Sequence, residues 1–438
     1  MPANNRQINP MGRRRFISAS AASVAGALLS DSAVSRARVP GANDRINIGV
    51  IGCGNRAAYL LESMAGFHNE ENFTVSAVCD VWKINREARI GQITEQFGAK
   101  PKVFKRYTDM LESPEVDAVM VTTSDLGHST ILAAACRAGK DAFCEKPMAM
   151  TVGEASEAVA AVRTNGRVVQ IGTQRRSDPI YMGGAQLVQA GKLGKVCVVE
   201  LKWNDAGPRW ERQYGNVHAG DIDWEGYQMH LPARAFDARR FRCWHLYGDY
   251  SIGVVGLLGA HHTDLLHWYM DEQWPESVTA TGATLTWPNR EHYDTIHASF
   301  KYPGGFLVHY ETRFGNSSMR AEAMFYGTAG VLDTKTWKIT GEGRVLPERL
   351  EPGNRQYPTS AFAMHEGQGQ GAGIEVQPDP AGMDHMLNWV QCLRTRKDPN
   401  ATVEHGFSHS LAAIMAHRAA DIGRRVSYDP VAREIREG

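Results

Sequence analysis

The sequence has no excess of charge of either sign. Its 438 residues carry 48 Lys and Arg against 48 Asp and Glu, and the sequence pI is about 7.3. Nucleic acids and anionic membrane surfaces attract proteins through clustered positive charge, and this balance gives no electrostatic reason to expect either partner. We therefore expect no nucleic-acid partner and no stable membrane anchoring.

Cysteine is too scattered for a disulfide framework. The seven cysteines are odd in number, and no two of them form a CxxC pair. Most stand in apolar contexts, which favours buried free thiols. The chain also lacks internal repeats and low-complexity blocks, so its length points to two ordinary globular domains with full cores.

Acidic residues are absent from residues 1–30. The segment Gly12-Arg13-Arg14-Arg15-Phe16-Ile17 precedes a mildly apolar stretch over 17–29, shorter than the roughly 20 residues that a membrane-spanning helix needs. A basic segment before a short apolar one is typical of an export signal, and Arg-Arg-x-Phe resembles the twin-arginine signal. We predict such a signal over 1–37, the twin-arginine machinery as a partner, and a bacterial periplasmic or exported location. A mitochondrial-type transit peptide is the alternative.

A glycine-rich turn joins an apolar strand pattern to a helical pattern over 46–57, I-N-I-G-V-I-G-C-G-N-R-A. Gly52 allows a tight turn, Gly54 has no Cβ to block a pyrophosphate, and Ala57 is small enough for helix-on-strand packing. The free N–H groups at the start of a helix bind such an anion. The turn therefore predicts a dinucleotide site.

An acidic residue ends the next predicted strand. Val75–Val78 is followed by Cys79 and Asp80, and an acid at this place grips the ribose hydroxyls of a dinucleotide. Because Asp80 would repel a 2′-phosphate, NAD is favoured as the cofactor. Arg56 and Lys83 leave NADP as the alternative.

Apolar strands continue to alternate with helical patterns. The run 116–121 has apolar residues at all but one position, and helical patterns occupy 57–66, 84–97 and 128–138. This alternation predicts a doubly wound parallel sheet covered on both faces. We assign residues 44–174 to this Rossmann domain, an α/β fold.

The T-x-D-x-x-H motif of Thr123, Asp125 and His128, and above all Glu145-Lys146-Pro147, resemble the Gfo/Idh/MocA oxidoreductase family, which includes glucose-fructose oxidoreductase and inositol dehydrogenase. The resemblance covers nearly the whole chain from Ile46 to about Arg424, and departs from the family at Ser124, where proline is frequent. It implies an NAD(P)-dependent oxidoreductase that transfers hydride between a sugar or sugar-derivative hydroxyl and a tightly bound nicotinamide cofactor. The cofactor-binding residues that it implies are Gly52, Gly54, Asn55, Arg56, Asp80, Thr123, His128, Glu145 and Lys146.

Lys146 stands where a parallel strand ends, the edge at which doubly wound sheets bind ligands. Pro147 restricts the backbone before it to extended geometry and permits a cis bond. An ammonium group fixed there can donate to a substrate oxygen and stabilise developing negative charge. We therefore predict that Lys146 is catalytic.

The second domain is assigned to 175–438. Aromatic residues and histidines crowd the loop-rich region 203–250, which suits the faces of a sugar, although packing of a long loop is the alternative. Alternating apolar residues over 277–325 predict a largely antiparallel open sheet in an α+β domain. The family resemblance implies that this sheet pairs subunits into a homo-oligomer, a dimer or a tetramer.

A second chemical stretch, Gly253 to Trp268, contains His261 and Asp264 on one predicted helix face. The resemblance makes His261 the general acid/base for the hydroxyl proton and places Leu257 where the family has a first Asp. Adjacent histidines point about 100° apart on a helix, so no metal site is predicted here. The predicted substrate-contacting residues are Lys146, Arg176, Tyr250, His261 and Asp264, of which Lys146 and His261 are catalytic.

Leu257 leaves a second function open. A glycosidase of the same superfamily oxidises a sugar hydroxyl transiently, eliminates the glycosidic group and reduces the sugar back. Export and the missing carboxylate make this NAD-dependent glycoside hydrolase the alternative to a net oxidoreductase. A non-catalytic sugar-binding protein is disfavoured because Lys146 and His261 are both present.

Overall fold

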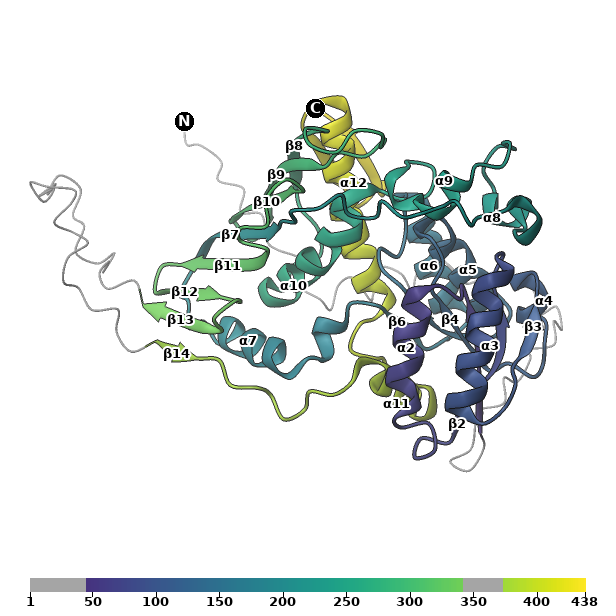
Figure 1. Ribbon diagram of the computed structural model, residues 1–438. Coiled ribbons are helices and arrows are strands. Elements are labelled where there is room, and N and C mark those ends of the chain that lie inside the picture. The colour runs from purple at the N-terminus through teal and green to yellow at the C-terminus, as the bar shows by residue number, and fades with distance from the viewer. Residues whose placement is uncertain (1–44, 342–372) are drawn as a thin grey trace, which may run out of the picture. The chain divides into compact units, whose positions relative to one another are not determined.

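The computed structural model describes residues 45–341 and 373–438 (Figure 1). The predicted export signal over 1–37 lies outside these residues. Within the two described ranges, no helix has the length and apolarity needed to cross a bilayer.

The first sheet has six parallel strands in the order β3-β2-β1-β4-β5-β6. The strands are β1 (Ile46–Ile51), β2 (Phe73–Cys79), β3 (Lys102–Phe104), β4 (Ala118–Val121), β5 (Asp141–Cys144) and β6 (Val169–Ile171). The helices between them are α2 (Asn55–Ala65), α3 (Lys83–Phe97), α4 (Tyr107–Leu111), α5 (Asp125–Arg137) and α6 (Val152–Thr164). The predicted doubly wound fold is confirmed, and its strand order reverses between β1 and β4, whose carboxyl ends form the ligand-binding edge.

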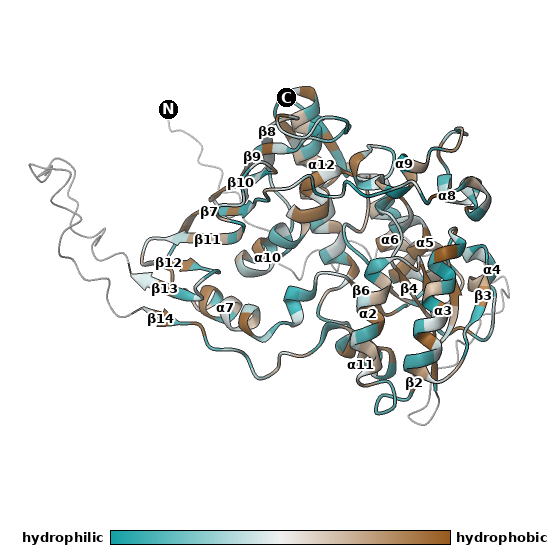
Figure 2. Ribbon diagram, in the orientation of Figure 1, coloured by the Kyte–Doolittle hydropathy of each residue, from teal (hydrophilic) through white to brown (hydrophobic). Residues whose placement is uncertain are grey.

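Burial explains why this sheet is parallel. Every residue of β4 and β5 is buried, because helices pack on both faces of the sheet. Helices α2 and α3 carry hydrophobic residues toward the sheet and hydrophilic residues elsewhere (Figure 2).

The second sheet has ten strands in the order β14-β13-β12-β11-β7-β10-β9-β8-β15-β16. Its strands are β7 (Val196–Trp203), β8 (Ser277–Ala283), β9 (Thr295–Lys301), β10 (Leu307–Arg313), β11 (Ala321–Gly327), β12 (Gly330–Asp333), β13 (Lys338–Gly341), β14 (Ile374–Glu375), β15 (Val426–Asp429) and β16 (Glu434–Glu437). Its neighbouring strands are antiparallel except β7 and β10, which pair in parallel. The largely antiparallel sheet predicted for this domain is confirmed.

Helices cover one face of the second sheet. In β9, Ile296, Ala298 and Phe300 are buried while the residues between them are half-buried or exposed, as expected for a sheet with one solvated face. The buried residues share a core with α7 (Pro179–Gln189), α10 (Ala260–Met270) and α12 (Val403–Ile422).

One late helix packs on the first domain. In α11 (His385–Thr395), Met386, Trp389 and Val390 are buried in the same core as β1 and β2. The Trp389 ring lies 5.9 Å from that of Phe143 on β5. The chain therefore returns from the second domain to cover the first.

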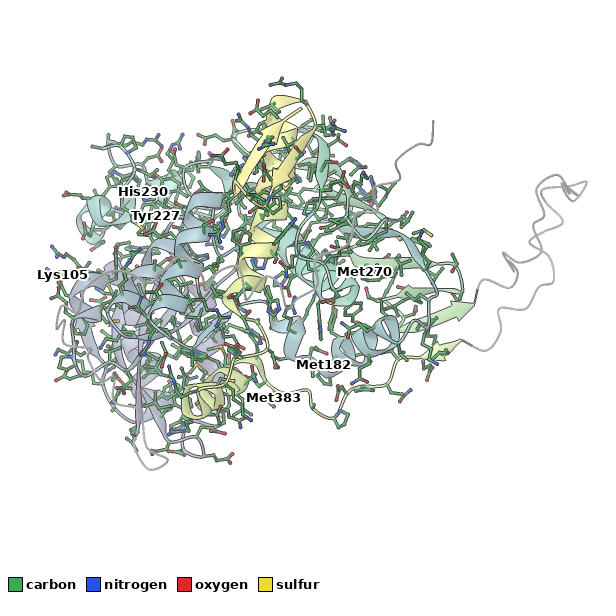
Figure 3. All side chains as sticks on the ribbon, turned by 180° about the vertical axis from the view of Figure 1, so that it is seen from behind. Lys105, Met182, Tyr227, His230, Met270 and Met383 are labelled. Atoms are coloured by element: carbon green, nitrogen blue, oxygen red, sulfur yellow. The ribbon has the colours of Figure 1, made fainter. Side chains whose placement is uncertain are left out.

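A loop-rich insert follows β7. It contains short helices η2 (Ala219–Asp221), α8 (Trp224–Gln228), α9 (Ala238–Arg242) and η3 (Trp244–Leu246). Its aromatic residues pack on one another: Tyr227, labelled in Figure 3, stacks on Trp224 and contacts Phe241 and Tyr250. These rings therefore pack the long loop, which was the alternative to a sugar-binding role.

Candidate active site

The glycine turn has the geometry that a pyrophosphate needs. Gly52 has φ +92°, and a Cβ there would lie 2.7 Å from backbone atoms of Thr122 and Thr123. A Cβ on Gly54 would meet no atom within 4 Å. Helix α2 begins at the exposed Asn55 with no side-chain cap and no acid in its first turn, so its N–H groups are left for an anion. These residues fit a dinucleotide.

Asp80, directly after β2, holds this turn in place. Its Oδ2 accepts the N–H of Cys53 at 2.6 Å and its Oδ1 accepts that of Trp82 at 2.7 Å. Burial raises the pKa of Asp80, against the effect of these two hydrogen bonds. The carboxylate therefore fixes the backbone of the glycine turn beside the place predicted for the ribose.

The two cations that left NADP open both have carboxylate partners. Lys83 lies 3.8 Å from Glu87 on the exposed side of α3, and Arg56 is paired with Glu145. Glu145 directly follows β5 and is buried, in space left by Gly172, where a Cβ would lie 2.8 Å from the carboxyl carbon. Burial favours the neutral acid, but Arg56 and Lys146 outweigh it and hold the pKa of Glu145 below its usual value.

Lys146 connects the two domains. Its peptide bond to Pro147 is cis, and its Nζ donates a hydrogen bond to the carbonyl oxygen of Leu257 at 2.5 Å. Leu257 lies in a short π-helix, η4 (Val255–Gly259), directly before α10. Leu257 stands where the family resemblance implied a carboxylate. It contacts Lys146 through its backbone carbonyl.

Neighbouring groups shift the pKa of Lys146 in opposite directions, and the net shift is downward. Burial lowers its pKa most, the carboxylates of Glu145 and Asp125 raise it, and Arg56 and Arg209 lower it further. Asp125, the first residue of α5, is buried, and burial raises its pKa while Lys146 opposes this shift. Asp125 was part of the predicted motif but was not among the predicted site residues.

His128 supports the turn that carries Lys146. Its Nδ1 lies 2.8 Å from the carbonyl oxygen of Pro147, and its Nε2 lies 3.2 Å from that of Thr123. Burial lowers its pKa. Both ring nitrogens face backbone carbonyls, so the structure gives His128 the role of fixing Thr123 and Pro147 relative to each other.

His261, near the start of α10, lies close enough to Lys146 for the two to interact electrostatically. Its ring stacks on Trp203 with centroids 5.9 Å apart, and Nη1 of Arg175 lies 3.5 Å from its carbonyl oxygen. Burial, followed by the positive charges of Lys146 and Arg175, holds the pKa of His261 well below its usual value. The imidazole is therefore neutral near pH 7.

Three predicted substrate contacts are occupied by protein partners. Nε of Arg176 lies 2.9 Å from both carboxylate oxygens of Asp264, and both side chains are buried. Burial raises the pKa of Asp264, and Arg176 opposes that shift. Tyr250 is also buried, and its hydroxyl accepts a hydrogen bond from Gln228 at 2.7 Å. In the described part of the chain, Arg175 rather than Arg176 is the arginine that reaches His261.

Removing Asp264 tests whether this ion pair is structural. We expect Asp264→Ala to lower the free energy of unfolding by about 3 kcal/mol, because Arg176 would keep a buried charge without its partner. Urea unfolding measures the loss, and the double variant Arg176→Met/Asp264→Leu should restore most of it. Unchanged unfolding with a raised KM would instead assign Asp264 to the substrate, as the sequence predicted.

The group with metal-ligand spacing among the described residues lies outside the His261 helix. Among the described residues, the group whose ligand atoms lie within 4.8 Å of one another is His297, His309 and Glu311, on β9 and β10. The rings of His261 and His262 instead contact Trp203.

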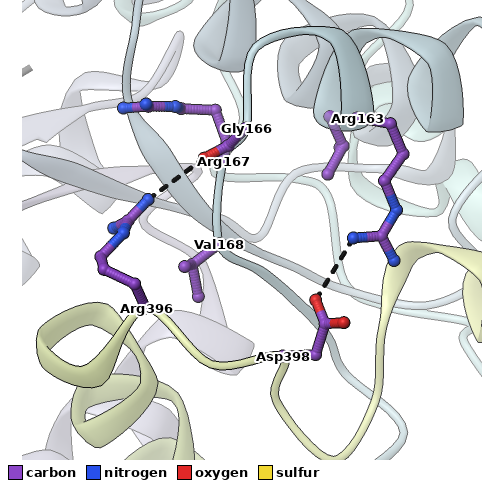
Figure 4. A pocket seen from close by; sticks show the side chains of 7 residues that line it. Arg163, Gly166, Arg167, Val168, Arg396 and Asp398 are labelled. Carbon is purple, nitrogen blue, oxygen red and sulfur yellow. Dashed lines mark hydrogen bonds and ion pairs between the residues drawn. The ribbon is translucent and has the colours of Figure 1, made fainter.

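A pocket lies at the amino edge of the first sheet (Figure 4), where the chain enters β6. Its arginines have protein partners: Arg163 pairs with Asp398 at 3.2 Å and Arg396 donates to the carbonyl of Gly166 at 3.3 Å. Since ligands of such sheets bind at the carboxyl ends of the strands, this pocket joins the closing segment to the sheet and is not the active site.

Comparison with known proteins agrees with this geometry. The profile described as an oxidoreductase family with an NAD-binding Rossmann fold matches residues 46–173, and that of the GFO/IDH/MocA C-terminal domain matches 184–333. These stretches together cover more than half of the chain. The chain belongs to the GFO/IDH/MocA oxidoreductase family. Its first domain is thus the family's NAD-binding domain, and the predicted cofactor, NAD, is confirmed.

Individual relatives match more weakly. Inositol 2-dehydrogenase of Salmonella typhimurium is 29% identical over 155 residues, which are 35% of this chain and 44% of that protein. The match therefore spans less than half of that dehydrogenase. Aldose-aldose oxidoreductase of Caulobacter crescentus is 18% identical, with a TM-score of 0.63 over 87% of this chain and 99% of that chain. The WlbA dehydrogenase of Bordetella pertussis, solved with NADH and UDP-GlcNAcA, is 18% identical with a TM-score of 0.62, over 88% and 99%. At this identity the two structures show the shared fold.

Gly54 offers a direct test of the cofactor site. We expect Gly54→Val to weaken NAD binding by about 10- to 100-fold, because its side chain would fill the space left for the pyrophosphate. The fold should tolerate it, since Gly54 has φ −74° and ψ −167°, an extended conformation open to valine. Titration with NAD measures the dissociation constant. Gly91→Val, which also adds a side chain into open space, is the matched control, and equal effects of both variants would contradict the assignment.

Proposed function

We propose that the protein is an NAD-dependent oxidoreductase that oxidises a hydroxyl group of a sugar or polyol. The observation that carries the proposal is the meeting of Lys146 and the η4–α10 segment at the carboxyl edge of the parallel sheet. An ammonium and a neutral imidazole, both acting on one hydroxyl, are the groups that this oxidation needs.

Different residues have different roles in the proposed reaction. Gly52, Gly54 and the start of α2 would hold the pyrophosphate of NAD, which supplies the hydride acceptor when bound. Lys146, held by the carbonyl of Leu257, donates a hydrogen bond to the reacting oxygen. His261, neutral because of burial and nearby cations, accepts the hydroxyl proton.

Similarity to named enzymes supports the substrate class. The relatives include an inositol 2-dehydrogenase and an aldose-aldose oxidoreductase, names that refer to a polyol and to aldoses.

A panel of sugars and polyols tests the function. Purified protein with NAD is mixed with each compound, and NADH formation is followed at the absorbance of the reduced cofactor. Formation of NADH with a free sugar or polyol supports the proposal. No NADH with any member of the panel overturns it.

The glycoside hydrolase alternative rests on Leu257, which replaces the family carboxylate. Its distinguishing result is release of the aglycone from an aryl glycoside with no net NADH.

Export through the twin-arginine route rests on residues 13–16, and a fusion of residues 1–37 to a reporter tests it. A homo-oligomer through the solvated face of the second sheet is supported by exposed Val198 and Leu307, and light scattering tests it.

A further inference from the structure

Positive side chains gather around the catalytic pair. The guanidinium of Arg175 lies 5.8 Å from the ring centre of Trp203, and that of Arg209 lies 5.9 Å from the same ring. Trp203 also stacks on His261. Two arginines and the proposed base therefore share one indole ring.

The insert adds two more arginines nearby. Trp210, whose ring lies 5.6 Å from the guanidinium of Arg209, stacks on His245 at 5.3 Å. The backbone N–H of Arg212 donates to Sγ of Cys243 at 3.3 Å, and Arg242 is close enough to lower the pKa of Arg212. Both arginines are half-buried.

The pairing of these cations is incomplete. Arg209 has Asp205 as a partner at 2.7 Å, and Arg56 has Glu145. Within residues 45–341 and 373–438, no carboxylate forms an ion pair with the remaining three, Arg175, Arg212 and Arg242. Burial lowers the pKa of Arg212, and Arg242 lowers it further.

Such an arrangement is costly without an anion. A half-buried guanidinium that lacks a counter-charge loses hydration, and the aromatic rings that Arg175 and Arg242 contact carry no formal negative charge to offset that loss. Its planar fork of N–H groups fits carboxylate and phosphate oxygens in pairs. The pyrophosphate of NAD already has its own site at the start of α2, so the anion that these arginines fit is a different one.

We propose that the arginines beside the catalytic pair bind an anionic group on the substrate, so that the reacting sugar carries a carboxylate or a phosphate. This inference rests on the proposed oxidoreductase function and narrows its substrate class. Arg175 lies next to His261 and contacts the substrate close to the reacting carbon, whereas Arg212, on the insert, contacts it farther away.

Matched substrates test the inference on the full-length protein with NAD. Glucose, glucuronate and glucose 6-phosphate are compared in NADH formation, and glucuronate and the phosphate ester are also titrated by calorimetry. We expect kcat/KM for one of the two anionic sugars to exceed that for glucose by at least about 10-fold, the range of a charge-assisted hydrogen bond. Preference for glucuronate assigns a carboxylate, and preference for glucose 6-phosphate assigns a phosphate. Binding of neither anionic sugar overturns the inference.

Variants locate the anion. Arg212→Gln should lower kcat/KM for the preferred anionic sugar about 10- to 100-fold, mainly through KM, and by more than for glucose. Arg212→Lys should recover part of the loss because it keeps the charge. The exposed Arg425→Gln is the surface control. Equal losses for charged and neutral sugars, or weaker NAD binding in Arg212→Gln, overturn the inference.

The two proposals fail in different ways. If neutral and anionic sugars are oxidised equally well, the substrate inference fails and the oxidoreductase function stands. If no sugar is oxidised, the function fails, and calorimetric binding of the anionic sugars still decides whether the arginines bind an anion.

Discussion

Lys146→Ala is expected to lower kcat by about 10³-fold while NAD stays bound. In the proposed reaction Lys146 supplies the positive charge that faces the reacting oxygen, and loss of one such donor or of a proton-transfer group typically costs 10²- to 10⁴-fold. The pyrophosphate site at Gly52 and Gly54 belongs to another loop, so cofactor affinity should change little. Steady-state NADH formation gives kcat, and NAD titration gives the dissociation constant.

Two further variants make this result specific. Lys146→Met keeps the length of the side chain without the charge and should lose as much activity as alanine. Lys192→Ala, at an exposed position after α7, is the control and should behave like the unmodified protein. Retained activity in Lys146→Met would remove Lys146 from the catalytic residues, and a parallel loss of NAD binding would assign it to the cofactor instead.

Local sequence signals predicted much of the fold. The helical pattern predicted over 84–97 is α3 to within one residue, and Gly98, with φ +75°, ends the helix. The apolar run over 116–121 contains β4. The parallel pairing of β7 with β10 and the strands β15 and β16 were not predicted, since pairing between distant segments leaves no local pattern.

The site was predicted where a motif fixes the backbone. Lys146 follows the buried strand β5 and precedes a proline, and these two features place it at the carboxyl edge of the sheet, where its Nζ contacts the carbonyl of Leu257. Its catalytic role stays a prediction. The substrate contacts proposed from the adjacent arginines depend on tertiary packing instead. The short helix η1 (Gln174–Ser177) turns Arg176 toward Asp264 and leaves Arg175 beside Trp203. No spacing in the sequence distinguishes these two orientations.

Lowering the pH from 7 to 5 is expected to destabilise the fold through its buried histidines. Burial lowers the pKa of His292 and His385 to about 4 and that of His267 to about 3, while a histidine in an unfolded chain has a pKa of about 6.5. Below pH 6.5 the unfolded chain therefore binds a proton at each of these residues that the folded protein does not bind. Stability falls with pH from about 6.5 down to the folded pKa values, and it is fully present above that range.

The expected loss in the free energy of unfolding is large for a protein of two domains. Each of the three histidines contributes about 1.5 to 2 kcal/mol between pH 7 and pH 5, or about 5 kcal/mol in total, against a typical folding stability of about 5 to 15 kcal/mol. Urea unfolding at the two pH values and one ionic strength measures the difference. His385→Gln should reduce it by about 2 kcal/mol, whereas His218→Gln, at an exposed position, should leave it unchanged. Equal unfolding midpoints at pH 7 and pH 5 would contradict the burial-lowered pKa values of these three histidines.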